Sequence, residues 1–244
     1  MRYIVVIPAR YQSSRLLGKP LVSLCGVPMI VRTYRQCLKA VAADEIYVAT
    51  DDERIQSVCA KHEMRVVMTS SACLTGTDRL AEVAIQVDAD VYISVQGDEP
   101  VFNPEDLTEL IKSAEAYPGQ VLNGYCAIND EAMIRCSSVP KVVMRVDGRL
   151  LYMSRAPIPT NKQLGFVRAW RQVCSYAFPK AVLSAFSART RKSPLEGIED
   201  IEILHLLELG FEVRMVEMTG DSIAVDTPED VLRVERAIQE RDLA

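Results

Sequence analysis

The spacing of apolar and polar positions predicts strands and helices that alternate along the first half of the chain. Runs rich in β-branched and other apolar residues at 4–7, 45–50, 65–68 and 90–95 are typical of strands. Between these runs, apolar residues recur at helical spacing, as in Met29, Ile30, Tyr34, Cys37, Leu38 and Val41. The alternation predicts a parallel sheet with helical crossovers, and therefore an α/β fold.

Capping signals indicate where the helices begin. The signals are proline in a first turn, Asp, Asn or Thr at the N-cap, and acidic residues facing the positive end of the helix dipole. They predict helices that start after Pro28, after Asp51-Asp52-Glu53, at about 78–86, after Asn103, after Pro179, at 199–209 and after Thr227. Gly210 stops the helix at 199–209. Later strands are predicted at 173–178 and 211–218.

The pattern changes from about Val121. Residues 142–146 and 150–154 are two apolar strands joined through Asp147-Gly148, which is the signal of a hairpin with a type I′ turn. We expect a single domain over 1–244 with a hairpin lobe at about 125–170 that covers the active edge or mediates dimerisation. Because exposed apolar patches often mark interfaces, the strand end with Leu150, Leu151 and Met153 predicts a homodimer.

Three cations follow the first strand, on a loop rich in proline and glycine. Arg10, Arg15 and Lys19 lie just beyond the carboxyl end of that strand, where open α/β sheets bind ligands. Guanidinium and ammonium groups together suit a polyphosphate. The loop is not a P-loop, because Ser13 replaces the first glycine and Pro20 replaces the metal-binding Ser or Thr. Taken alone, the segment fits solvated surface cations equally well.

Acidic residues occur at the same predicted edge. Asp98 comes directly after the strand 90–95, next to a glycine, and this position favours a carboxylate that holds a metal. Taken alone, Asp226 is better explained as a turn residue before the N-cap Thr227. Thr75 to Arg79 alone fits a plain N-cap, and Arg155 alone fits a solvated cation.

Composition narrows the classes of function. A net charge of −5 argues against general nucleic-acid binding, which needs a basic surface. The seven cysteines form no C-x-x-C pair, so we interpret them as small core residues in a reducing compartment. Neither a signal peptide nor an apolar run long enough to span a bilayer is present, so we expect a cytoplasmic protein without a membrane partner.

Several segments, taken in order, resemble one known family. They are Ile-Pro-Ala-Arg-Tyr-x-Ser-Ser-Arg-Leu-x-Gly-Lys-Pro (7–20), Ala-Thr-Asp (49–51), Thr-Gly-Thr-Asp-Arg-Leu-Ala-Glu (75–82), Val-Gln-Gly-Asp-Glu-Pro (95–100), Ser-Arg-x-x-Ile-Pro (154–159) and Val-Asp-Thr-Pro-Glu-Asp (225–230). Together they resemble the CMP-Kdo synthetases, the 3-deoxy-manno-octulosonate cytidylyltransferases, nearly end to end. The resemblance implies a Rossmann-like nucleotidyltransferase fold, a mostly parallel sheet with an antiparallel hairpin lobe. It also implies an enzyme of surface-polysaccharide synthesis (lipopolysaccharide or capsule).

Such an enzyme uses CTP and Mg²⁺ to join CMP to the anomeric hydroxyl of a 2-keto-3-deoxy sugar acid, and it releases pyrophosphate. The resemblance assigns the triphosphate to Arg10, Ser14, Arg15 and Lys19. It assigns Mg²⁺ to Asp98 and Asp226, which form the catalytic set with Lys19. Arg79 would lie near the nucleotide, Gln96 near the ribose or sugar, and Arg155 would pair with the sugar carboxylate.

Most departures from the family pattern lie on the sugar side. Gln172, four residues before Tyr176, stands where many Kdo enzymes have His, and Ile203 stands where a late helix usually offers Gln. These three residues are expected to face the sugar, so its identity stays open between Kdo, a close relative and a nine-carbon acid of the sialic-acid type. A non-catalytic nucleotide-binding subunit is the alternative from another class. His62 and His205 fall in helical stretches, so neither is expected to act as the general base. The simplest substitute is a bound metal that lowers the pKa of the attacking hydroxyl.

Overall fold

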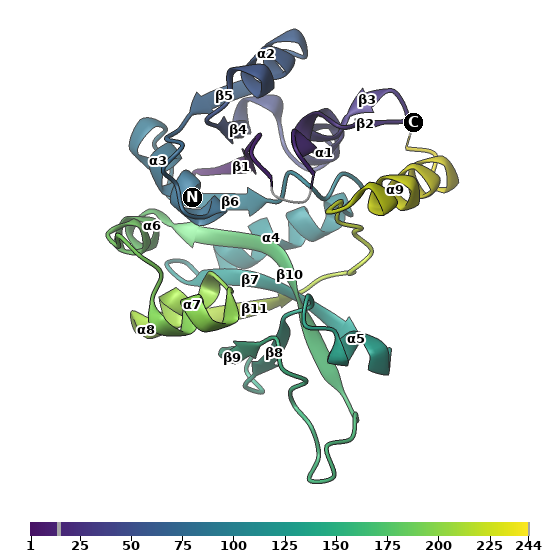
Figure 1. The fold of residues 1–244 in the computed structure, drawn as a ribbon. Coiled ribbons are helices and arrows are strands. Elements are labelled where there is room, and N and C mark those ends of the chain that lie inside the picture. The colour runs from purple at the N-terminus through teal and green to yellow at the C-terminus, as the bar shows by residue number, and fades with distance from the viewer. Residues whose placement is uncertain (14–15, 244) are drawn as a thin grey trace.

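The computed structural model describes residues 1–13 and 16–243 and shows a mixed sheet with helices on both faces (Figure 1). The strands are β1 (Tyr3–Ala9), β2 (Ser23–Leu24), β3 (Val27–Pro28), β4 (Ile46–Thr50), β5 (Arg65–Met68), β6 (Val91–Val95), β7 (Val121–Ile128), β8 (Lys141–Met144), β9 (Leu150–Ser154), β10 (Ala169–Pro179) and β11 (Val213–Glu217). The α-helices are α1 (Met29–Cys37), α2 (Glu53–Lys61), α3 (Gly76–Gln86), α4 (Pro104–Ala116), α5 (Glu131–Arg135), α6 (Lys180–Ser187), α7 (Pro194–Glu199), α8 (Ile203–Glu208) and α9 (Pro228–Glu240). Short 3-10 helices lie at Lys19–Leu21 and Ala43–Glu45.

The sheet order confirms the α/β prediction. The strands lie in the order β11-β7-β10-β6-β1-β4-β5, and the β8–β9 hairpin pairs onto β10. The pairs β1–β4, β1–β6, β4–β5 and β7–β11 are parallel. Strand β10 runs antiparallel to both β6 and β7, so the antiparallel part reaches the middle of the sheet as well as the hairpin.

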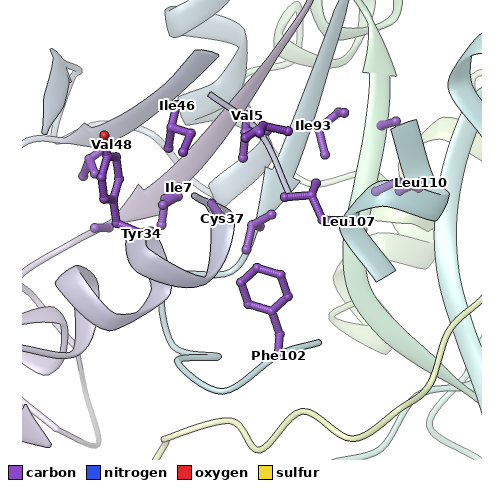
Figure 2. Packing of buried hydrophobic residues seen from close by; sticks show 14 of the residues in the cluster. Val5, Ile7, Tyr34, Cys37, Ile46, Val48, Ile93, Phe102, Leu107 and Leu110 are labelled. Atoms are coloured by element: carbon purple, nitrogen blue, oxygen red, sulfur yellow. The ribbon is translucent and has the colours of Figure 1, made fainter. Parts of the chain in front are cut away.

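Alternate residues of β1 pack into two separate cores. Val5 and Ile7 face a cluster with residues of α1, α2 and α4, which Figure 2 shows around Tyr34, Cys37 and Leu107. Ile4 and Val6 face a second cluster, formed with α3, α6 and α8. All four side chains are buried, and each such side chain contributes about 1.5–3 kcal/mol relative to exposure. The continuous apolar run is therefore explained by burial on both faces.

Several predicted boundaries are wrong. Helix α1 ends at Cys37, and residues 38–41 form hydrogen-bonded turns instead of the expected last helical turn. The helix predicted at 199–209 is interrupted, because Asp200 ends α7 with a left-handed φ of 52° and α8 begins only at Ile203. Strand β10 begins at Ala169, earlier than the predicted start at 173.

The hairpin is confirmed, but its turn type is not. A type I′ turn needs positive φ at both central residues. In the turn Arg145–Arg149, positive φ occurs at Gly148 (83°) and not at Asp147. The backbone of Arg145 accepts from the Gly148 N–H and donates to the Arg149 carbonyl, which is the pattern of a three-residue loop with a glycine bulge.

No helix within the described residues is long and apolar enough to cross a membrane.

Candidate active site

The carboxyl ends of β1 and β6 meet at one edge of the sheet. From β1 the chain moves outward to β4 and β5, and it then returns to β6 on the other side of β1. Such a reversal of strand order leaves a crevice outside the strand ends, where open α/β sheets bind ligands. Strand β1 delivers Arg10 to this crevice, and β6 delivers Gln96 and Asp98.

A cavity of about 360 Å³ lies at this edge, and we call it the nucleotide cavity because the sequence predicts nucleotide binding for residues that line it. Its lining includes most of the residues predicted for nucleotide and metal binding: Arg10, Lys19, Arg79, Gln96, Asp98 and Asp226. Ser14 and Arg15 lie outside the described residues. Segments that are distant in the sequence therefore converge on one polar cavity.

Lys19, Asp98 and Asp226 form a compact charged cluster in the nucleotide cavity. The Lys19 ammonium donates to a carboxylate oxygen of Asp98 and to Oδ1 of Asp226, at 3.1 Å from the latter. The lysine side chain is 16% exposed, and the two carboxylates are 26% and 35% exposed. The cluster therefore stays open to solvent and to a ligand.

Backbone contacts hold the two carboxylates in place. The Val225 N–H donates to the Asp98 carbonyl at 2.9 Å, and Val225 is fully buried against α1 and α9. The Asp226 N–H donates to Asp230, which caps α9. Gly97 is required beside Asp98, because a Cβ there would lie 2.9 Å from the Pro8 carbonyl oxygen.

Thr69 and Asp51 hold Arg79 in place, and the sequence did not predict a role for either residue. Its guanidinium donates to the Thr69 hydroxyl and lies 3.5 Å from a carboxylate oxygen of Asp51. Arg79 is buried, so these partners fix the direction in which it faces the cavity. The Ala-Thr-Asp motif at 49–51 is the sequence feature that could have predicted a role for Asp51.

Glu202 is a lining residue of the nucleotide cavity that was missed. It accepts hydrogen bonds from the Thr77 N–H, at 3.2 Å, and from the Thr77 hydroxyl. Burial raises the pKa of Glu202 above its ordinary value. The sequence did not predict that Glu202 lines the cavity. A continuous helix was predicted over 199–209, whereas Glu202 lies at a break between α7 and α8.

Another cavity, of about 520 Å³, shares Asp226 with the nucleotide cavity and is here called the second cavity. Gln172 lines it, and Gln172 Nε2 donates to Asn123 Oδ1 at 3.0 Å and to the Tyr176 hydroxyl at 3.2 Å. Glu99 also lines it, and burial together with neighbouring Asp98 raises the pKa of Glu99 to about 7.

The remaining predicted sugar residues line neither cavity. Arg155, Tyr176 and Ile203 are not among the described residues that line either one. Ile203 and Tyr176 are buried in the core beside α6, and burial raises the pKa of Tyr176 well above its ordinary value. Arg155 donates instead to the backbone carbonyls of Ser137, Glu199 and Asp200.

The cluster of Asp98 and Asp226 suits Mg²⁺ with a phosphate substrate. The described residues contain no group of three or more His, Cys, Asp or Glu side chains that could hold a metal ion by themselves. Mg²⁺ is commonly bound by one or two carboxylates together with substrate phosphates and water. Two carboxylates that converge on one ammonium, inside a cavity lined by further cations, match that donor set.

The chain is similar to known cytidylyltransferases in both sequence and fold. The cytidylyltransferase family model matches residues 4–217. The 3-deoxy-manno-octulosonate cytidylyltransferase of Myxococcus xanthus is 39% identical, over 98% of each chain. That of Escherichia coli is 36% identical, over 99% of this chain and 97% of its own. The solved structure of CMP:2-keto-3-deoxy-manno-octonic acid synthetase complexed with CTP covers 99% of this chain and all of its own, with a TM-score of 0.92 and 35% identity.

Fold and site together define an α/β nucleotidyltransferase of the cytidylyltransferase class. Within that class, the chain belongs to the 3-deoxy-manno-octulosonate cytidylyltransferase family, the CMP-Kdo synthetases.

Proposed function

We propose that this chain transfers CMP from CTP to the anomeric hydroxyl of Kdo or a close 2-keto-3-deoxy relative, with release of pyrophosphate. The observation that carries the proposal is the convergence of Lys19, Asp98 and Asp226 in a cavity that also presents Arg10 and Arg79. Cations in that cavity would neutralise the triphosphate, and the two carboxylates would hold Mg²⁺ against it. A solved relative that is 35% identical is complexed with CTP, which supports CTP as the nucleotide.

The residues divide the work of the reaction. Arg10 and Lys19 would orient the phosphates, and Arg79 would position the nucleotide. When bound, Mg²⁺ would supply charge neutralisation at the α-phosphate and lower the pKa of the attacking hydroxyl. Gln96 lies beside Asp98, where it can orient either the ribose or the sugar.

We place the sugar acid next to Asp226, at the junction of the two cavities. A sugar bound there would have its anomeric hydroxyl near the metal ligands, and Gln172 in the second cavity could face its distal part. Tyr176 would help to orient Gln172 through the hydrogen bond between them. Ile203 belongs to the same apolar cluster as Tyr176 and would support it by packing. Arg155 would reach the sugar carboxylate from the edge of the hairpin lobe.

Pyrophosphate release, measured with each nucleoside triphosphate against a panel of ulosonic acids, tests the proposal. We expect turnover with CTP and an eight-carbon 2-keto-3-deoxy acid, and loss of that turnover when EDTA removes divalent metal. A preference for nine-carbon acids would instead support the sialic-acid type of synthetase. Absence of turnover with every acid, from protein that binds CTP, would contradict the transferase proposal.

The hairpin lobe is also proposed to form a homodimer interface. Of the apolar residues first used to predict this, Leu150 and Met153 are buried within the chain, and Leu151 is exposed. Val146, Leu164 and Val167 of the same lobe are also exposed, and the segment between β9 and β10 extends away from the sheet in Figure 1. These residues supply the exposed apolar surface that an interface needs.

Light scattering at micromolar concentration is expected to give twice the mass of one chain. The double change Leu151→Glu and Val167→Glu should yield monomers, because it places charges in the apolar interface. Ile85→Glu, at an exposed apolar position on α3, is the matched control and should leave the dimer intact. A monomeric wild type would refute this assignment.

A further inference from the structure

A buried ion-pair network joins α3 to α7. Arg189, which follows α6, donates from Nη1 to Oδ1 of Asp78 on α3 and from Nη2 to Oε1 of Glu196 on α7, both at 2.8 Å. The side chains of Arg189, Asp78 and Glu196 are only 7%, 13% and 0% exposed. Because desolvation offsets much of the attraction between buried charges, such a network adds little net stability. What it does set is the position of the Asp78 carboxylate.

Asp78 is the residue through which the network reaches the nucleotide cavity. Its other oxygen, Oδ2, accepts from the Thr75 N–H at 2.9 Å and from the Thr75 hydroxyl at 2.8 Å, and these bonds form the capping box of α3. Thr75 and Gly76, at the start of this first turn, line the cavity, and so does Arg79. The Arg189 guanidinium therefore fixes the carboxylate that in turn fixes these lining residues.

The charge balance shows how far Asp78 depends on Arg189. Within the part of the chain that the structure describes, Arg189 is the only cation paired with the Asp78 or Glu196 carboxylate. Without the guanidinium, Oδ1 of Asp78 would lose its donor in a largely buried position, which is costly for a charged group. Turning toward water would break its bonds to Thr75 and let the first turn of α3 shift. A misplacement of about 1 Å is enough to weaken the contacts of a bound ligand strongly.

We propose that Arg189 is a positioning residue for the nucleotide: through Asp78 it holds the first turn of α3 in the arrangement that binds CTP. The inference rests on the proposed binding of CTP in the nucleotide cavity. It adds to that binding a residue that lines neither the nucleotide cavity nor the second cavity. The affinity for CTP then depends on a buried ion pair that does not touch the ligand.

The dissociation constant of CTP, measured by isothermal titration calorimetry with Mg²⁺ and without sugar, tests this role. Arg189→Met keeps the length of the side chain and removes its charge, and we expect it to raise the constant by about tenfold. Arg189→Lys keeps a cation that can pair with Asp78 and should recover most of the affinity. Glu196→Gln is the matched control, because Glu196 is the partner of the same guanidinium that does not lie on α3. It should lower the unfolding temperature and leave the affinity for CTP unchanged.

A double change shows whether Arg189 acts through Asp78. Asp78→Asn should weaken CTP binding by itself, and adding Arg189→Met to it should cause little further loss. Arg189→Gln provides a second neutral variant if Arg189→Met does not fold. The role is overturned if the folded neutral variants bind CTP as wild type does, if Glu196→Gln weakens binding equally, or if the effects of Asp78→Asn and Arg189→Met simply add. Because affinity is read without sugar, a chain that binds CTP and fails to transfer CMP would disprove the proposed reaction and leave the role of Arg189 intact.

Discussion

Asp98→Asn is expected to lower turnover by about a thousandfold or more while the protein still folds. The change replaces a carboxylate with an amide of the same shape, so the backbone contacts of Asp98 with Val225 and of Gly97 with Pro8 are kept. It removes one of the two anionic oxygen donors proposed for Mg²⁺, and a neutral amide is a weaker ligand for this hard cation than a carboxylate. Pyrophosphate release at saturating CTP and sugar, over a range of Mg²⁺ concentrations, measures the effect.

Asp44→Asn is the matched control, because Asp44 is exposed on the surface near the start of β4. It should leave both turnover and the unfolding temperature unchanged. The unfolding temperature of Asp98→Asn shows that any loss of activity comes from folded protein. Near-normal, magnesium-dependent turnover in the folded Asp98→Asn protein would mean that the metal is held elsewhere.

The positions of the residues predicted for the nucleotide could be inferred from the sequence because the signals that place them are local. A buried strand followed by a charged loop fixes where Arg10 and Asp98 lie, since parallel strands bring their carboxyl ends to one edge. The N-cap at Thr227 likewise fixes Asp226 at the start of α9. The structure brings these residues together across the whole length of the chain, with Lys19 between the two aspartates.

The surroundings of the residues predicted for the sugar could not be inferred from the sequence because they depend on tertiary packing. The antiparallel insertion of β10 between β6 and β7 involves partners distant in sequence, and no local pattern specifies it. The break after Asp200 turns Ile203 into the core and leaves Glu202 at the nucleotide cavity. Glu202 and Ile203 are adjacent in the sequence, yet only Glu202 lines the cavity. The spacing of apolar residues along a helix does not predict the orientation of a side chain to within one residue.

Arg155→Ala is expected to raise the KM for the sugar acid by about 30-fold or more, with little change in the KM for CTP. Removing one partner of a desolvated charge pair costs about 2–5 kcal/mol, and the lower figure corresponds to about 30-fold. Every candidate sugar carries a carboxylate next to its anomeric carbon. Of the five N–H donors of this guanidinium, three already hold the backbone carbonyls of Ser137, Glu199 and Asp200. These bonds fix Arg155 between the hairpin lobe and Asp200, and Asp200 lines the nucleotide cavity.

Initial-rate kinetics in both substrates, together with the unfolding temperature, separate recognition from support of the fold. Arg168→Ala is the matched control, because Arg168 is a cation of the same lobe whose guanidinium lies 4.9 Å from the Trp170 ring centre. It should leave both KM values unchanged. If Arg155→Ala lowers the unfolding temperature and raises both KM values together, the guanidinium only holds the three carbonyls in place. A rise confined to the sugar acid, in protein of unchanged affinity for CTP, would instead identify Arg155 as its carboxylate partner.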